Sequence, residues 1–182
     1  MPAPPILTER LLLRPWREED LKAFAELNAD PVIMEPFPKT LDRRESDELA
    51  ARFQDQERRH GFGRWAVEAP GVAPFIGCVG LSRVDFEVPF APCVEVAWRL
   101  ARPYWGRGYA TEAALAWLRF GFERLGLEEI VAFTVPANRR SRAVMERLGM
   151  TRTESEDFDH PLLPEGHPLR RHVLYRLRRP GH

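Results

Sequence analysis

Residues 104–113 read Tyr-Trp-Gly-Arg-Gly-Tyr-Ala-Thr-Glu-Ala, and they join a predicted strand to a predicted helix. The strand covers 94–100, which is rich in β-branched and aromatic residues. The helix covers 109–125, because apolar residues recur there at helical spacing and a glycine follows. Two glycines before a helix N-terminus let backbone N–H groups approach an anion, and the helix dipole adds to the attraction. The turn therefore predicts a diphosphate site, with Arg107 as an additional cation.

Other interpretations of this turn are possible. A plain tight turn competes with the phosphate site, since glycine serves both purposes. A Walker loop is excluded, because no Lys-Ser or Lys-Thr follows the last glycine. A dinucleotide fingerprint is disfavoured, because it needs a third glycine where this chain has Thr111. It also needs an acidic residue at the end of the next strand, and that strand ends Thr134-Val135-Pro136.

The rest of the chain predicts an α/β (α+β) fold, with a mixed, mostly antiparallel twisted sheet flanked by helices. The expected strands are 8–14, 64–69, 75–81, 94–100, 129–135, 151–158 and 170–177. The expected helices are 18–27, 42–59, 109–125 and 138–148. Three adjacent strands in the middle of the chain indicate an antiparallel meander. The strand–helix–strand unit after it predicts a crossover with parallel strands, and a ligand at the carboxyl end of strand 94–100.

Length and composition narrow the class of protein. The 182 residues fit a single domain spanning 1–182, and 44% apolar residues argue against disorder. A net charge of zero gives no reason to expect a nucleic-acid or membrane partner, and no apolar run is long enough to span a bilayer. Cys78 and Cys93 form no disulfide framework, and the first residues lack a secretion signal. We therefore expect a cytoplasmic monomer or homodimer.

Three segments resemble the GNAT superfamily of N-acetyltransferases, in particular the branch that acetylates ribosomal-protein N-termini. Residues 8–15 look like the opening strand of that branch, 104–113 like its pyrophosphate loop, and 138–150 like its second cofactor helix. The resemblance spans about residues 8–155. It implies a GNAT-like domain that uses acetyl-coenzyme A as co-substrate, without a metal, and transfers the acetyl group directly to a primary amine. The acceptor is a peptide N-terminus or a small amine such as a polyamine, an amino acid or an aminoglycoside.

The resemblance also implies which residues contact the cofactor. The family loop is written Gln/Arg-x-x-Gly-x-Gly/Ala, and its positions fall on Trp105, Gly108 and Ala110. Trp105 departs from the usual Gln or Arg, although a loop that works through backbone groups tolerates this. The implied cofactor contacts are Trp98, Leu100, Trp105, Gly106, Arg107, Gly108, Tyr109, Ala110, Thr111, Asn138 and Ser141.

The proton chemistry is assigned to two residues. Many family members carry a tyrosine acid at the position of Met145, which cannot donate a proton, so Ser141 is the candidate donor to the leaving thiolate. Glu95 is the candidate base, because an attacking amine must be neutral. A lysine-like amine has a pKa of about 10.4 and needs such a base more than an α-amine with a pKa of about 7.7–8.0. A free backbone N–H near Trp98 would stabilise the oxyanion.

Each of these assignments has a plainer alternative. Asn138 is a normal helix N-cap, Ser141 can bond within the first helical turn, and Glu95 can be an ordinary strand residue. Asp157 and His160 lie in a polar loop that borders the acceptor pocket in the family, so they are candidate acceptor contacts. The spacing of His160, His167 and His172 matches no zinc pattern, which argues against a metal. A non-catalytic acyl-coenzyme A-binding module is the alternative function, and Met145 at the acid position is its support.

Overall fold

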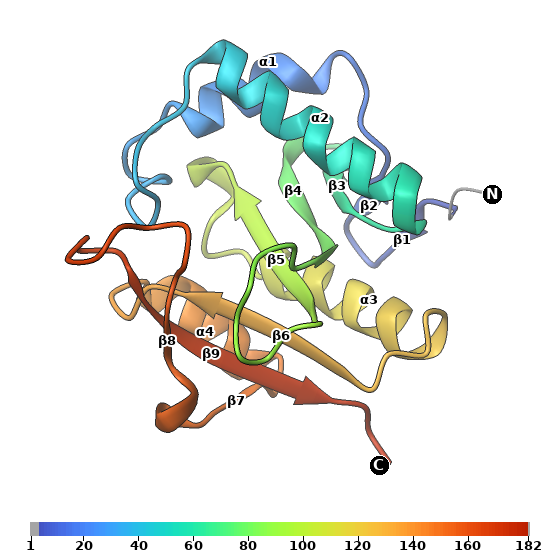
Figure 1. Cartoon of the computed structure of the whole chain (residues 1–182). Coiled ribbons are helices and arrows are strands. Elements are labelled where there is room, and N and C mark those ends of the chain that lie inside the picture. The colour runs from blue at the N-terminus through green and yellow to red at the C-terminus, as the bar shows by residue number, and fades with distance from the viewer. Residues whose placement is uncertain (1–3, 182) are drawn as a thin grey trace.

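The computed structural model describes residues 4–181, which form one sheet with helices on both of its faces (Figure 1). The strands are β1 (Ile6–Leu7), β2 (Leu12–Arg14), β3 (Arg64–Ala69), β4 (Ala73–Arg83), β5 (Val94–Leu100), β6 (Glu129–Thr134), β7 (Thr151–Arg152), β8 (Phe158–Asp159) and β9 (Arg171–Arg178). The helices are α1 (Asp20–Asn28), α2 (Arg43–His60), α3 (Tyr109–Glu123) and α4 (Arg139–Arg147). Two short 3-10 turns lie at Arg102–Tyr104 and Glu154–Glu156.

The order of strands in the sheet is β1-β2-β3-β4-β5-β6-β9-β7, and β8 pairs with β9. β3, β4 and β5 form the predicted antiparallel meander. β5 and β6 are parallel, as the predicted crossover through α3 requires. The α/β fold class with a mostly antiparallel sheet is therefore confirmed.

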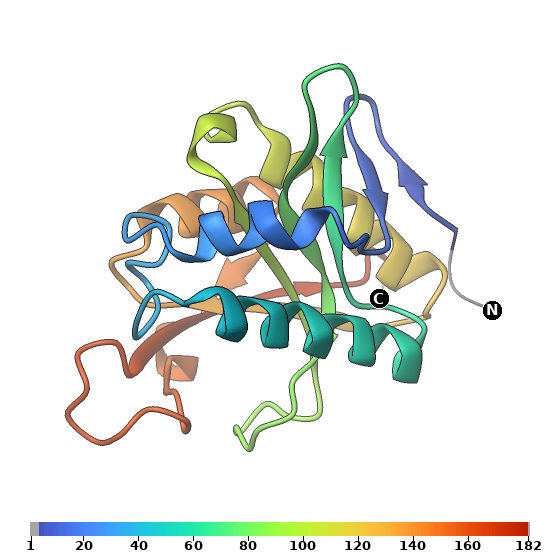
Figure 2. The ribbon, with the colours of Figure 1, turned by 90° about the horizontal axis from the view of Figure 1, so that it is seen from above.

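Helices α1 and α2 cover one face of the sheet, and α3 and α4 cover the other (Figures 1 and 2). The larger core lies under α3, where Trp65 of β3 meets Trp117 of α3 edge-to-face at 5.0 Å between ring centroids. A second core lies under α1 and α2 and is built from aromatic residues that include Phe24, Phe53 and Phe75. β5 is sandwiched between these layers, so its successive side chains point alternately toward α3 and α4 and toward α1 and α2.

Local signals set the helix ends. Asp42 caps α2 and forms a capping box with Glu45, and Gly61 ends the helix in the left-handed conformation. Asn138 caps α4 by accepting a hydrogen bond from the backbone N–H of Ser141. Within residues 4–181, no helix combines the length and the apolar character that crossing a bilayer requires.

Two predicted strands were wrong in detail. Residues 8–14 contain a reversal, because the Thr8 hydroxyl and backbone bond to Leu11 and fold the chain into the short β1–β2 hairpin. Residues 151–158 are not one strand but β7, a 3-10 turn and the start of β8. The interruption follows from an ion pair between Arg152 and Asp157, which draws the two ends of this segment together.

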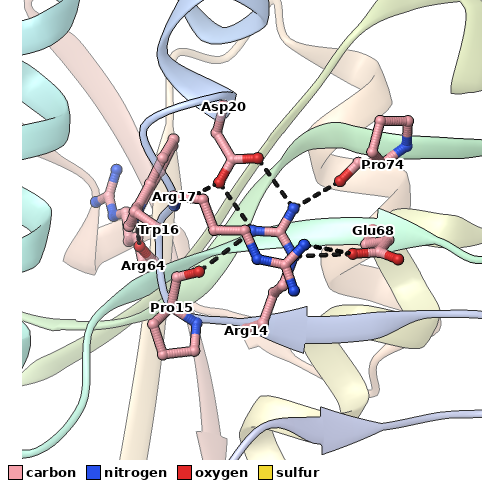
Figure 3. A network of polar contacts seen from close by, with 8 residues as sticks. All are labelled: Arg14, Pro15, Trp16, Arg17, Asp20, Arg64, Glu68 and Pro74. Carbon is pink, nitrogen blue, oxygen red and sulfur yellow. Dashed lines mark hydrogen bonds and ion pairs between the residues drawn. The ribbon is translucent and has the colours of Figure 1, made fainter.

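A buried arginine ties the N-terminal segment to the sheet (Figure 3). Arg14 of β2 forms a two-pronged ion pair with Asp20 at the start of α1, with N–O distances of 2.8 and 2.9 Å. It also bonds to Glu68 of β3 at 2.9 Å and to the carbonyl of Pro74 in β4 at 2.7 Å. The Arg14 and Asp20 side chains are each only 3% exposed. Hydrogen bonding to Asp20 raises the pKa of Arg14, so the charge that orients α1 over the sheet is permanent.

Candidate active site

The glycine turn between β5 and α3 has the open geometry of an anion site. Gly106 and Gly108 have φ angles of 71° and 79°, in the left-handed region that side chains avoid. Gly108 is the N-cap of α3, so the N–H groups of the first helical turn, from Tyr109 onward, have no acceptor within the helix. A Cβ added at Gly106 would meet no atom within 4 Å, so this side of the turn faces open space.

The turn is braced from the beginning of the chain. Thr8 and Arg10 both donate hydrogen bonds to the Glu112 carboxylate, at 2.7 to 2.8 Å. Arg10 also donates to the carbonyl of Arg107 at 2.9 Å and lies 4.7 Å from the centre of the Tyr109 ring. These contacts hold the turn in place from outside, and leave its open side free.

The contacts of Trp105 show how the turn is held although this residue replaces the Gln or Arg that is usual in the family. The indole N–H donates to the carbonyl of Leu100 at 2.8 Å, so Trp105 fastens the turn to the end of β5. The Arg140 guanidinium of α4 lies 4.4 Å from the centre of the Trp105 ring. The charge of Arg140 therefore lies beside position 105, where many family members carry an arginine. Nothing in the sequence around Arg140 distinguished it from the other arginines, so this neighbour was missed.

One buried polar atom at the turn has no protein partner. The hydroxyl of Thr111, in the first turn of α3, is shielded from solvent and unbonded within residues 4–181. A buried hydroxyl without a partner costs free energy, and a ligand oxygen would satisfy it. The free N–H groups, the open side of Gly106 and this hydroxyl fit the diphosphate of coenzyme A.

The second part of the site is a gap in the sheet. β5 pairs with β4 at seven successive positions, but with β6 only at Glu95↔Val131. Past this pair the two strands diverge, as Figure 1 shows. No strand of the described chain therefore covers this edge of β5 from 96 to 100, and its backbone N–H groups need another partner. An N–H here, near Trp98, is therefore available to a ligand oxygen.

Ser141 and Trp98 meet across this gap. The Trp98 indole N–H donates to the Ser141 hydroxyl oxygen at 3.3 Å. Because that oxygen is an acceptor in this contact, the hydroxyl keeps its own proton for another partner. Asn138 accepts from the Ser141 backbone N–H and donates to the Thr134 hydroxyl, which fixes the start of α4. Met145 is 2% exposed and packs in the core under α3 and α4.

Glu95 lies on the opposite face of β5 from Trp98. Its carboxylate pairs with Arg64 of β3 at 2.9 Å, and the Glu95 side chain is 12% exposed. Arg64 also donates to Ser82 at 3.3 Å. Burial raises the pKa of Glu95, while Arg64 acts in the opposite direction. A carboxylate with a raised pKa is a better proton acceptor than an exposed one.

The two predicted acceptor contacts lie together near β9, but they differ in environment. Asp157 is occupied by Arg152 and by the backbone N–H of Leu174, and Arg152 lowers its pKa. His160 packs against Phe86 at 4.5 Å and beside His172 at 5.0 Å between ring centroids. Burial lowers the pKa of His160, and the neighbouring histidine adds to this effect. Within residues 4–181, no three His, Cys, Asp or Glu side chains are grouped as metal ligands.

The glycine turn at a helix N-terminus and the unpaired edge of β5 beside it fit a protein that binds a diphosphate-bearing acyl carrier. The family model described as the acetyltransferase (GNAT) domain matches residues 10–151, and the chain belongs to this family. It is an N-acetyltransferase with acetyl-coenzyme A as its co-substrate. The residues at the turn and the gap are those that would hold the cofactor.

The chain is similar to several known proteins. It is 30% identical to the FsC-acetyl coenzyme A-N(2)-transacetylase of Aspergillus fumigatus, in an alignment of 192 positions that covers 98% of this chain and 81% of that protein. An acetyltransferase structure from Agrobacterium tumefaciens is 30% identical, with a TM-score of 0.78 and coverage of 98% and 96%. A ribosomal-protein-S5-alanine acetyltransferase from Vibrio fischeri is 18% identical, with a TM-score of 0.75 and coverage of 98% of both chains. The predicted GNAT membership is confirmed, and the likeness to the ribosomal-protein branch is a likeness of fold.

Proposed function

We propose that the enzyme transfers the acetyl group to a primary amine, either a peptide N-terminus or the amine of a small molecule. The amine nitrogen attacks the thioester carbonyl carbon, a C–N bond forms, and the C–S bond breaks. The attacking nitrogen loses one proton, and the leaving thiolate gains one. The products are an N-acetylated amine and coenzyme A.

The observation that supports this proposal is that Glu95 and Trp98, whose indole contacts Ser141, lie on opposite faces of β5 next to the gap. Glu95 lies on the face under α1 and α2, where its largely buried carboxylate takes the proton from the amine, directly or through water. Ser141 lies on the α4 side and donates its free hydroxyl proton to the sulfur. A backbone N–H near Trp98 stabilises the oxyanion between them. The acceptor then enters from the face of Glu95, and the cofactor lies on the side of Ser141.

The acceptor pocket, in this proposal, extends from Glu95 toward the loop that follows β8. His160 stands at that loop and is neutral at physiological pH, because burial lowers its pKa. We assign it to acceptor contact, together with Asp157, whose carboxylate also stabilises the loop itself through Arg152. Cys78 and Cys93 are both free thiols, which suits the reducing cytoplasm where we place the enzyme.

A pair of glycine variants tests the cofactor assignment. Acetyl-coenzyme A at about 100 times its Kd should stabilise the wild type by about 2.7 kcal/mol, or about 5–10 °C in Tm. Gly106→Ala should lose this shift, because the methyl group enters the open side of the turn. Gly71→Ala is the matched control: its φ of 78° and open surroundings are the same, but it lies in the β3–β4 turn.

Both variants carry the same backbone strain, so they should lose similar intrinsic stability. Equal shifts with acetyl-coenzyme A in both would refute the assignment of the turn. Release of free thiol over a panel of amines then tests the transfer itself, and release without any N-acetylated product would contradict it.

A further inference from the structure

Arg99 lies four residues after Glu95, on the face of β5 where we place the acceptor. It is the second arginine there, after Arg64 of β3, which pairs with Glu95. Glu95, Ala97 and Arg99 alternate with the residues that face α3, so their side chains share the face under α1 and α2. Arg99 donates to the side-chain oxygen of Asn28 in α1 at 2.7 Å. Its guanidinium also lies 4.2 Å from the centre of the Phe37 ring, in the segment between α1 and α2. Arg99 is therefore fixed beside the proposed acceptor, and does not reach into solvent.

The Arg99 charge has no anionic partner. Within the described residues 4–181, no carboxylate lies within ion-pair distance of it. The neighbouring arginines differ in this respect, since Arg64 pairs with Glu95 and Arg102 pairs with Asp30 at 2.6 Å. Burial lowers the pKa of Arg99 to about 10, and repulsion from Arg64 contributes. The group stays charged at neutral pH, so Arg64, Glu95 and Arg99 together carry one positive charge in excess.

The hydrogen bond that Arg99 donates to Asn28 does not remove this imbalance. Asn28 is fully buried, and its amide nitrogen donates to the Ser46 hydroxyl, which turns its oxygen toward Arg99. A neutral amide orients the guanidinium but leaves its charge uncompensated. A half-buried charge without a counter-ion is costly, and an anionic ligand would relieve that cost. The remaining guanidinium N–H groups match the two oxygens of a carboxylate.

We propose that Arg99 binds a carboxylate of the acceptor, so that the preferred acceptor carries both a primary amine and a carboxylate. This inference rests on the proposed function and names its substrate class. Glu95 and Arg99 are separated by about 13 Å along the strand, from four steps of about 3.3 Å. Ala97 lies between them with only a methyl group, which leaves room for the acceptor carboxylate at Arg99 and for water between the acceptor amine and Glu95. A polyamine or aminoglycoside would instead bring more positive charge to a face that already has an excess.

Matched acceptors test this inference. For each of several side chains, acetylation of the free amino acid is compared with that of its amide and of its decarboxylated amine. Values of kcat/KM are expressed per concentration of neutral amine, because these compounds differ in amine pKa. We expect the wild type to favour the amino acid by about tenfold to hundredfold, the value of a hydrogen bond to a charged group. Spermidine should be a poor acceptor.

Three variants separate binding from structure. Arg99→Gln should reduce the carboxylate preference to about one, with acetyl-coenzyme A affinity unchanged, and Arg99→Lys should keep part of the preference. Arg102→Gln, which removes an arginine that already has Asp30 as partner, should keep the preference intact. A second arm of the experiment compares tripeptides that begin with Asp, whose side chain supplies a carboxylate, with tripeptides that begin with Asn, whose side chain does not. An Asp preference that Arg99→Gln abolishes would support the same role.

Two results would overturn the inference. The first is a wild type that acetylates amines with and without a carboxylate equally well. The second is an Arg99→Gln variant that slows all acceptors by the same factor, which would make Arg99 a structural support for α1. If the wild type acetylates no amine of any class, the proposed function itself fails and this inference fails with it.

Discussion

Replacing Ser141 with alanine tests the assignment of the proton donor. Ser141 Oγ accepts from the Trp98 indole at 3.3 Å, so its own proton is free for the departing sulfur. Losing a hydrogen bond to a charged partner costs about 1.5–3 kcal/mol, which corresponds to about tenfold to 150-fold in kcat. The thiolate has a reference pKa near 8.5 and can leave without help, so we do not expect a complete loss.

Trp98→Phe tests the same contact from its other side. The bond from the indole is neutral and lies at the long end of the hydrogen-bond range, so it should be worth about 0.5–1 kcal/mol, or twofold to fivefold in kcat. In the Ser141→Ala background, Trp98→Phe should add little, because its partner is already gone. This non-additivity separates a positioning role from a general loss of packing.

The assay is coenzyme A release at saturating acceptor, measured from about pH 6 to 10 with cofactor affinity determined separately. A serine hydroxyl does not titrate in this range, so the loss in Ser141→Ala should be the same factor at every pH. A variant that binds acetyl-coenzyme A more weakly but keeps the wild-type kcat would refute the donor role. Ser141 would then be a cofactor contact.

Four further predictions concern the base, its arginine partner, the acceptor loop and the fold. Glu95→Gln should lose most activity at neutral pH and recover as the pH approaches the amine pKa; an unchanged pH–rate profile would make Glu95 a structural residue. Because Arg64 acts to lower the pKa of Glu95, Arg64→Gln should raise it and move the acid limb of kcat/KM to higher pH. His160→Ala should raise the KM for the acceptor more than it changes cofactor affinity, and the reverse pattern would argue against an acceptor contact. Asp20→Ala leaves Arg14 buried with fewer partners and should cost about 3–5 kcal/mol, lowering Tm by about 6–20 °C; a smaller loss in thermal denaturation would mean that water replaces the carboxylate.

The sequence predicted the parts of the fold that are governed by local rules. Periodicity and turn residues placed α2, α3, α4 and the central strands to within a few residues, and the capping roles of Asp42 and Asn138 follow from short-range contacts. The prediction was wrong where a contact interrupts an extended segment, as Arg152 and Asp157 do near the C-terminus. No local pattern reveals such a pairing in advance.

The same limit applies to the site. The glycine turn was recognisable because phosphate binding there depends on backbone geometry, which glycine reports directly. The charge balance on the face of β5 that carries Glu95 and Arg99 could not be recognised from the sequence, because it depends on residues far apart in the chain. Arg64 meets Glu95 across 31 positions, and Arg99 meets Asn28 across 71. Only the fold shows which arginines have a counter-ion and which do not.

The brace on the glycine turn has a consequence for how the protein is made. Thr8 and Arg10 are synthesised more than 100 positions before Glu112, their partner beside the turn. Contacts between such distant positions form late, because a long loop must close first. The turn therefore reaches its final shape only after the whole meander and the first turn of α3 have been synthesised. A nascent chain cannot bind the cofactor before that point, and a truncation that removes the first ten residues would leave the turn without its support.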